Sequence, residues 1–237
     1  MDEKPKTNET NNLKLTIINV YGIDETRLSS GFPMLEEYDE RAFFDNLNNY
    51  GALTKADGRL ERLAACKGGE SHDCCLCGIV AQFNLSAPRY FWQEWQRYHF
   101  QDIVSSMSTM HRLKAFIVKA KAMFNAIKDE QTNEAYFNYV YQHFSAETDI
   151  SMIDTFIRLA SEILNTDENG EIIDKKYKQY IKSNLPEGFI ITARITTNYR
   201  QLKTIYHQRR YHELAEWRTF CNYYLNLFPH KNLIMGE

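Results

Sequence analysis

The chain has 237 residues, 43% of them hydrophobic, which is enough for one sizeable globular domain or two small ones, and we expect one. Its formal net charge is −3, and its acidic and basic residues are interspersed, which excludes a basic surface suited to gripping long nucleic acid. It has no run of about 18 apolar residues and begins with a polar segment, so we expect neither a membrane span nor a signal peptide. We therefore expect a cytoplasmic protein whose five cysteines are reduced.

The first part of the chain alternates between predicted strands and helices. Residues 1–12 are polar and predict a disordered leader, so a single domain is expected to occupy 13–237. The apolar and β-branched segments at 13–20 and 79–85 predict strands. Between them the sequence predicts short helices and a loop, over 43–53, 58–66 and 70–73.

Three longer helices are predicted in the centre of the chain. Apolar residues recur there every three or four positions, which is the pattern of helices that bury one face. The expected helices span 111–128, 132–144 and 150–164, with a turn over 167–170. A shorter helix over 175–185 follows them.

The segment from Leu185 to Arg210 predicts a strand that leads directly into a cationic helix. Residues 188–197 are mostly β-branched, and Asn198 stands where a helix N-cap belongs. Free backbone amides at such a helix start, with Arg200 in the first turn, suit a phosphate. The alternative is an ordinary capped helix whose basic face is solvated.

The last predicted element is one more helix. It is predicted over 214–228 and ends at Pro229, which cannot continue a helix. The predicted elements together indicate an α+β fold with more helix than strand.

A second candidate site lies on a helix that Ser86 and Pro88 are expected to open and that runs to about residue 100. On this helix a polar stripe is expected, formed by Glu94, Arg97, Tyr98 and Gln101. The guanidinium of Arg97 suits a phosphate or carboxylate, because its planar donors match two oxygens at once. The alternative is a simple exposed pair between Glu94 and Arg97.

Four hydroxyl side chains follow that helix within five residues. They are Ser105, Ser106, Ser108 and Thr109, and His111 stands beside them. They can donate to a phosphate or cap the next helix. Capping alone explains one hydroxyl, not four.

Other common chemistries lack support in the sequence. Cys74 and Cys77 have C-x-x-C spacing with His72 and Cys66 nearby, but a structural zinc needs two separated ligand pairs, so we expect no metal and cysteines that fill small apolar gaps. No phosphate-binding glycine loop and no nucleophile elbow is present. The 15 Tyr and 14 Phe predict core and subunit-interface packing, with ring stacking on a flat ligand as the alternative.

The two strand-to-helix blocks together resemble the flavin-dependent thymidylate synthases. In the C-terminal block the family's residues match without gaps at Leu185, Pro186, Asn198, Arg200, Leu202 and Arg209, and residues 215–218 fit with one insertion. In the first block Ser86-Ala87-Pro88 and the Glu-Trp-Gln-Arg of 94–97 are similar to family motifs. The resemblance covers most of 70–112 and 182–220.

The chain departs from the family pattern at several positions. Of the family's Arg-His-Arg signature only Arg97 matches without a gap, and Lys182 stands where the family has an arginine. A family Glu-His pair becomes Cys77-Gly78, which leaves His72 as the nearest imidazole. These substitutions resemble a divergent branch of the family found in phages and Firmicutes, so a phage protein acting in the host cytoplasm is also expected.

The resemblance implies an α+β fold with a small mixed or antiparallel sheet, assembled as a homotetramer. It implies FAD as cofactor and methyl transfer to C5 of a pyrimidine deoxynucleotide, as from dUMP to dTMP, with methylenetetrahydrofolate and NADPH as co-substrates. Left open are a related enzyme with another pyrimidine substrate, a nucleotide-binding or regulatory homologue without catalysis, and a purely structural oligomer.

The resemblance also implies roles for individual residues, although it assigns no catalytic residue and no metal ligand. The residues expected to bind the nucleotide are Glu94, Arg97, Ser105, Ser106, Ser108, Lys182 and Arg209. Those expected to contact the flavin are His72, Tyr98, His99, Asn198 and Arg200.

Overall fold

The computed structural model of the chain describes residues 12–67, 72–165, 172–174 and 176–236. Most of the expected leader, part of the loop over 70–73 and the turn over 167–170 lie outside these residues. The chain divides into two compact units, each made of separate segments. Unit 1 comprises the described residues within Met1–Leu85, Arg97–Ser105 and Arg194–Glu237. Unit 2 comprises the described residues within Ser86–Gln96 and Ser106–Ala193. The expectation of a single domain stays a prediction.

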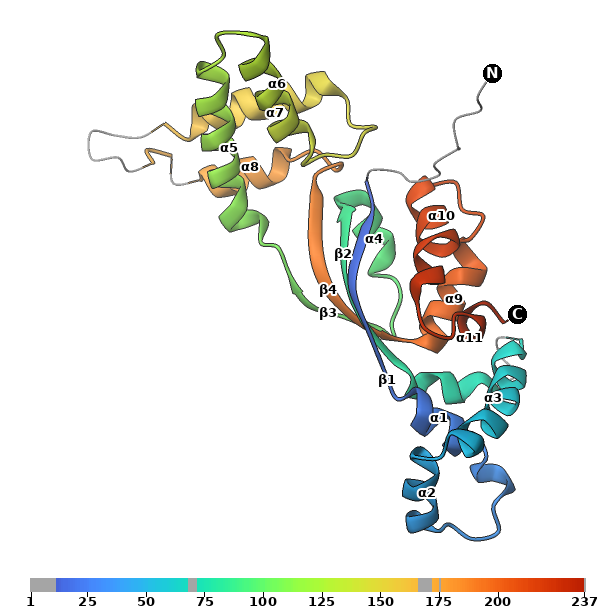
Figure 1. Cartoon of the computed structure of the whole chain (residues 1–237). Helices are drawn as coiled ribbons and strands as arrows, with labels where there is room; N and C mark the ends of the chain where they lie inside the picture. The colour runs from blue at the N-terminus through green and yellow to red at the C-terminus, as the bar shows by residue number, and fades with distance from the viewer. Residues whose placement is uncertain (1–11, 68–71, 166–171, 175, 237) are drawn as a thin grey trace, which may run out of the picture. The chain divides into compact units, whose positions relative to one another are not determined.

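A four-stranded antiparallel sheet has the order β1-β2-β4-β3 (Figure 1). Its strands are β1 Lys14–Tyr21, β2 Val80–Pro88, β3 Gln101–Ser106 and β4 Ile190–Asn198. Side chains alternate between buried and half-buried along β2, as expected for a sheet that has one face in the core. The predicted α+β class with a small sheet is thus confirmed.

Unit 1 contains helices from both ends of the chain. These are α1 Ile23–Ser29, α2 Glu40–Leu47, α3 Tyr50–Ala65, α9 Tyr199–Arg209, α10 Ala215–Asn222 and α11 Asn232–Met235, with short 3₁₀ helices η1 Phe32–Met34, η2 His72–Gly78 and η3 Tyr224–Leu227. Phe83 of β2 packs against Phe220 and Phe228, with ring centroids 6.2 and 5.6 Å away. Trp217 and Tyr199 are completely buried beside them. These aromatic residues pack in the core, as predicted, whereas the predicted subunit-interface packing stays a prediction.

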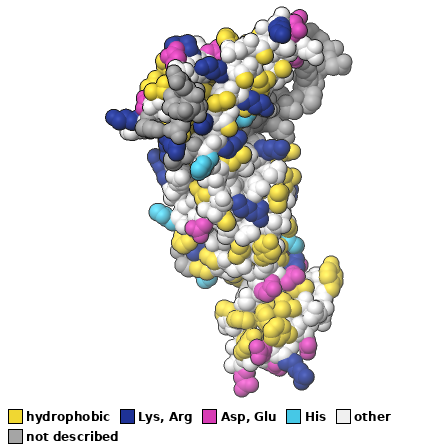
Figure 2. Space-filling model, turned by 90° about the vertical axis from the view of Figure 1, so that its left-hand side faces the viewer, with side chains coloured by type: hydrophobic (Ala, Val, Ile, Leu, Met, Phe, Trp, Pro, Cys, Tyr) yellow, Lys and Arg dark blue, Asp and Glu magenta, His cyan; other side chains and the backbone are white. Residues whose placement is uncertain are grey.

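Exposed apolar side chains gather on the segment that contains η1 and α2 (Figure 2). The rings of Phe32, Tyr38 and Phe43 contact one another there at centroid distances of 5.5 to 6.2 Å. Phe32 and Tyr38 remain 43% and 59% exposed, so this cluster is packed only on one side.

Unit 2 holds the remaining helices, and four of them, all except the first, surround a second core. They are α4 Arg89–Trp95, α5 Thr109–Asn125, α6 Glu130–Tyr141, α7 Ile150–Ile163 and α8 Tyr177–Asn184. Phe116, Phe144 and Phe189 pack together in this core, at centroid distances of 5.3 to 6.1 Å. The apolar faces predicted for the three central helices meet here, so those helices are confirmed.

Two predicted helix boundaries in the N-terminal region are wrong. We expected helices over 43–53 and 58–66, but the break between α2 and α3 falls at Asn48 and Asn49. The side chain of Asn49 accepts a hydrogen bond of 3.2 Å from Ala52 N and so starts α3 earlier. Gly58, expected as a helix start, lies inside α3.

The predicted helix over 86–100 is wrong at both ends. Ser86 belongs to β2, where its hydroxyl bonds to that of Thr192 at 2.7 Å instead of capping a helix. The helix α4 ends at Trp95, so Glu94, Arg97, Tyr98 and Gln101 do not form a helical stripe. Gln101 instead begins β3, a strand that was not predicted.

Two smaller corrections concern the termini of predicted segments. His72 and Asp73, expected in a loop, begin the 3₁₀ helix η2. The helix expected over 214–228 is interrupted after Asn222 and continues only as η3. Among the described residues no helix is both long and apolar enough to cross a membrane.

Candidate functional site

The candidate site is built around the junction between β4 and α9 in unit 1. The side chain of Asn198 accepts a hydrogen bond of 2.9 Å from Gln201 N, so the predicted N-cap is confirmed. Tyr199 N donates to Ile79 O at 3.0 Å. Two of the first three amides of α9 are therefore engaged, which corrects the expectation of an open anion-binding helix start. A ligand at the start of α9 would therefore be recognised by side chains rather than by free backbone amides.

Arg200 is held in place by a carboxylate from another segment. Its Nε donates to Asp73 Oδ1 at 3.0 Å, and Lys203 Nζ donates to Asp73 Oδ2 at 2.9 Å. Lys203 also donates to Cys66 O. The side chains of Asp73 and Lys203 are almost completely buried, whereas that of Arg200 is 33% exposed. Asp73 thus orients Arg200 at the surface. Burial lowers the pKa of Arg200, but Asp73, Cys74 and Cys77 together outweigh this effect and raise the pKa above its usual value.

A hollow of about 260 Å³ opens beside these residues, and we call it the α9 hollow. It is lined by Asp73, Cys77, Phe100, Asn198, Arg200, Gln201 and Thr204. The backbone of Phe100 is fixed on both sides, because its N donates to Gln201 Oε1 at 3.3 Å and its O accepts from Thr197 Oγ1 at 2.9 Å. Its ring is 69% exposed.

The α9 hollow offers both polar groups and an apolar surface to a ligand. Arg200 and Asn198 offer donors for phosphate or ring oxygens, and the ring of Phe100 offers an apolar surface. Pockets that enclose a whole small-molecule ligand hold about 300 to 1,000 Å³, so this hollow of about 260 Å³ accommodates only a fragment of a larger ligand.

Arg209 has a separate and rigid setting at the end of α9. Its Nε donates to Tyr98 Oη at 2.9 Å, and its guanidinium lies over the ring of Trp217 at 5.0 Å. Tyr98 in turn donates to Gln208 Oε1 at 3.1 Å and packs edge-on against Trp217. The guanidinium plane is therefore fixed by an aromatic frame, which suits recognition of a planar or tetrahedral anion.

Four further predicted site residues of unit 1 are exposed. Arg97 and His99 follow α4, Ser105 lies in β3, and His72 begins η2. Tyr98 is buried and contacts Arg209, so the structure brings these two predicted residues together. Asn198 and Arg200 are likewise brought together at the α9 hollow.

The remaining predicted residues belong to unit 2. Glu94 is half-buried in α4, and Ser106, Ser108 and Lys182 are exposed. Ser108 occupies the N-cap position of α5, but its side chain makes no capping hydrogen bond. Capping by the Ser108 side chain therefore does not account for the hydroxyl run.

Several lining residues were missed by the sequence interpretation. No sequence motif marked Asp73, which is a single acidic residue next to several cysteines. Phe100 was assigned to the end of a predicted helix. Gln201 and Thr204 follow from the confirmed helix α9, since they share a face with Asn198 and Arg200 at helical spacing. A helical projection from the Asn198 cap could have found these two.

The cysteines are free, and they differ in burial. Cys74 and Cys77 are exposed, so the prediction that they fill apolar gaps is wrong for these two. Cys221 is buried, and burial raises the pKa of its thiol to about 12. Within the described ranges no group of three or more His, Cys, Asp or Glu side chains could hold a metal ion.

Comparison of the sequence with protein-family models and with curated proteins gives no match. The solved structures similar to this chain include two of ThyX from Helicobacter pylori, a flavin-dependent thymidylate synthase, each with FAD and dUMP. The first has a TM-score of 0.65 and 13% identity over 94% of this chain and 98% of that chain. The second has a TM-score of 0.64 and 12% identity over 95% and 97%. The chain has the fold of the flavin-dependent thymidylate synthases.

Proposed function

We propose that this protein is a flavin-dependent enzyme that transfers a one-carbon unit to C5 of a pyrimidine deoxynucleotide. One observation carries the proposal: in a chain with this fold, Asn198 and Arg200 line one hollow at the start of α9. Both residues match the C-terminal block of the family pattern. The divergent-branch assignment is part of the same proposal.

Asn198 and Arg200 bind FAD in this proposal. The Asp73 carboxylate holds Arg200 Nε, so the rest of the guanidinium is positioned before a ligand arrives and less ordering entropy is lost on binding. Reduced FAD supplies the hydride, methylenetetrahydrofolate the one-carbon unit and NADPH the reducing equivalents. His72, Tyr98 and His99 stay predicted flavin contacts.

Arg209 binds the nucleotide phosphate in this proposal. Tyr98 and Trp217 fix its guanidinium plane, which favours two parallel hydrogen bonds to phosphate oxygens. Arg97 and Ser105 are proposed to assist as exposed donors of the same unit. Glu94, Ser106, Ser108 and Lys182 of unit 2 stay predicted nucleotide contacts.

We also propose that the active form is a cytoplasmic homotetramer. The α9 hollow of about 260 Å³ is too small for a whole dinucleotide, so surface from a second copy would complete the cofactor site. Light scattering should give four times the mass of one chain, and a monomer that binds FAD tightly would contradict this part.

FAD titration of two Asn198 variants tests the flavin site. Aspartate caps a helix as well as asparagine, so Asn198→Asp should keep the melting temperature while its negative charge lowers FAD affinity at least about ten-fold. Asn198→Ala removes the cap and should lose about 1 kcal/mol of stability. Wild-type protein that stays colourless and takes up no added FAD would refute the proposal.

Product analysis tests the reaction and its alternatives. The protein is incubated with FAD, NADPH, methylenetetrahydrofolate and either dUMP or dCMP. The masses of the nucleotide products are then measured by mass spectrometry. A methylated product from dUMP supports the proposal, and one from dCMP identifies a different pyrimidine. Nucleotide binding without NADPH oxidation identifies a regulatory homologue. Arg209→Lys, which keeps the charge but loses the planar fork, should weaken nucleotide binding.

A further inference from the structure

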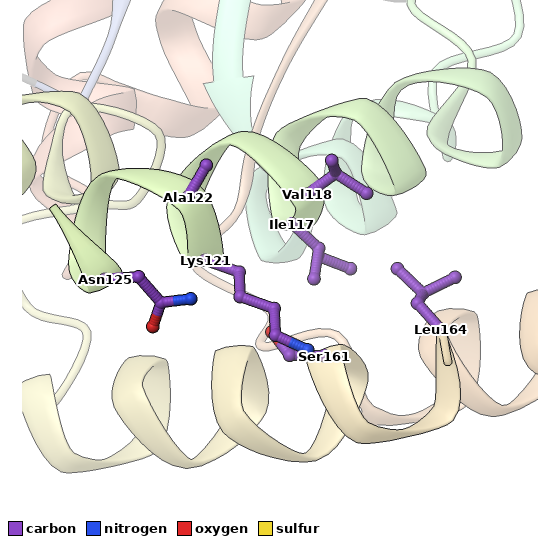
Figure 3. Close-up of a pocket in the computed structure, with 7 residues that line it drawn as sticks. All are labelled: Ile117, Val118, Lys121, Ala122, Asn125, Ser161 and Leu164. Atoms are coloured by element: carbon purple, nitrogen blue, oxygen red, sulfur yellow. The ribbon is translucent and has the colours of Figure 1, made fainter. Parts of the chain in front are cut away.

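A second hollow lies within unit 2, between helices α5, α6 and α7, and we call it the helical pocket. Its volume is about 530 Å³, within the range of pockets that enclose small molecules. A smaller hollow of about 250 Å³ adjoins it between α5 and α7. Lys121, Asn125 and Ser161 line both, and Figure 3 shows Lys121 extending from α5 toward α7.

Ser161 lines both hollows and carries an unsatisfied polar atom. The residue is only 8% exposed, and its Oγ is buried without a hydrogen-bond partner among the described residues. A buried hydroxyl without a partner destabilises a fold, because its hydration is lost and not replaced. A ligand with a donor or acceptor at this position would remove that cost.

Aromatic rings form another wall of the helical pocket. Phe124 and Tyr136 contact each other edge-on at 5.6 Å, and Tyr136 and Phe137 at 5.7 Å. Phe124 is 60% exposed and Phe137 39% exposed, although both rings are large and apolar. Such rings favour a planar ligand, which they can contact by stacking or edge-on.

The charges around the helical pocket balance. Lys121 and Arg158 are matched by Asp154 and Glu162, so the lining has no formal net charge. Arg158 and Glu162 are paired at 3.2 Å, and Asp154 accepts a hydrogen bond from Tyr141 at 3.0 Å. This environment gives no preference for an anion, and the pocket is therefore unsuited to a phosphate.

Amide side chains complete the polar part of the lining. Asn125, Asn133 and Asn165 each carry both donors and an acceptor. That mixture matches the edge of a nitrogen heterocycle, which presents ring nitrogens and exocyclic donors or acceptors side by side.

We propose that the helical pocket binds a neutral, planar nitrogen heterocycle of nucleoside size. Its ring packs against Phe124 and Phe137, and its polar edge bonds to Ser161 Oγ. The proposal does not depend on the flavin site, because every residue that carries it belongs to α5, α6, α7 or the residues that follow them.

Methyl NMR of the full-length protein tests this binding directly, with uridine and adenosine as probes. Saturable shifts are expected for the methyl groups of Ile127 and Ile157, which line the pocket. Adenosine monophosphate should bind this pocket at least ten-fold more weakly than adenosine. Toluene, which has no hydrogen-bonding group, should bind more weakly still.

Two variants and a matched control separate binding from folding. Ser161→Ala should keep or raise the melting temperature, because an unpaired hydroxyl is removed, and weaken adenosine binding about ten-fold. Asn125→Trp should fill the pocket and abolish the shifts. Lys114→Trp, also exposed on α5 but outside the lining, should leave them unchanged.

Several results would overturn the proposal. They are the absence of pocket shifts with both nucleosides up to their solubility limit, equal affinity for adenosine and its monophosphate, and equal affinity for toluene. Unchanged binding in Ser161→Ala would also overturn it, and this variant decides the outcome if Asn125→Trp fails to fold.

Discussion

At the scale of single residues, Asp73 organises the candidate site. It is buried, yet it holds two cations from one face of α9, Arg200 and Lys203. Removing one partner from a buried ion pair leaves an uncompensated charge, which destabilises far more than losing an exposed pair. Asp73 therefore couples the stability of the fold to the orientation of Arg200.

We predict that Asp73→Ala lowers the free energy of unfolding by roughly 3 to 5 kcal/mol, because Lys203 is left buried and unpaired. Urea denaturation measures the change. Replacing the pair by apolar side chains, as in Asp73→Leu with Lys203→Met, should recover much of the loss. Glu162→Ala breaks an exposed pair with Arg158 and should lose less than about 1 kcal/mol. Equal losses in the two single variants would contradict the coupling.

At the scale of elements, the start of β4 is fixed by the loop between α6 and α7. Ser145 N donates to Gly188 O at 2.8 Å, and Ile190 N donates to His143 O at 2.8 Å. Gly188 has no room for a side chain, since a Cβ there would lie 1.8 Å from Thr148 Oγ1. The glycine in the Leu-Pro-Glu-Gly segment is thus required by close approach of this loop.

We predict that Gly188→Ala destabilises unit 2 by about 1 to 3 kcal/mol through this overlap. Thermal unfolding measures it, and adding Thr148→Ala should restore most of the loss, because the overlapping oxygen is removed. Gly58→Ala in α3 is the control, since its Cβ would meet only ordinary contacts and alanine favours a helix by about 1 kcal/mol. Failure of Thr148→Ala to restore stability would show that the overlap is not the cause.

At the scale of the whole molecule, each unit contains a histidine whose neutral form is favoured. In unit 2, burial lowers the pKa of His143, which packs between Phe116 and Phe189. In unit 1, burial lowers the pKa of His207, with Arg210 adding to the effect. Between the folded pKa and the unfolded value of about 6.5, the unfolded chain binds more protons than the folded chain.

We therefore predict that the stabilisation from these two neutral histidines is fully present above about pH 7. The free energy of unfolding should decrease as the pH falls below 6.5. Melting temperatures measured between pH 7.5 and 5.5 should show this decrease. His143→Gln should flatten the pH dependence, and adding His207→Gln should flatten it further. An unchanged pH profile in the double variant would contradict the assignment.

The sequence by itself determined the elements whose signal is local. Strands β1, β2 and β4 follow from β-branched runs, α5 to α7 from apolar periodicity, and the start of α9 from the capping side chain of Asn198. Of the candidate site it determined α9 and its Asn198 cap, which place Asn198 and Arg200 at the start of one helix.

Only the tertiary structure decided the rest. The edge strand β3 was not found from local signals, because it is defined by its pairing with β4. Just after its last residue, Met107 N donates to Thr192 O of β4 at 2.9 Å. The partner of Arg200 is Asp73, 127 positions earlier in the chain, and the partner of Arg209 is Tyr98, 111 positions earlier. Local periodicity reports which face of an element is buried, but contacts between distant segments depend on how the whole chain packs.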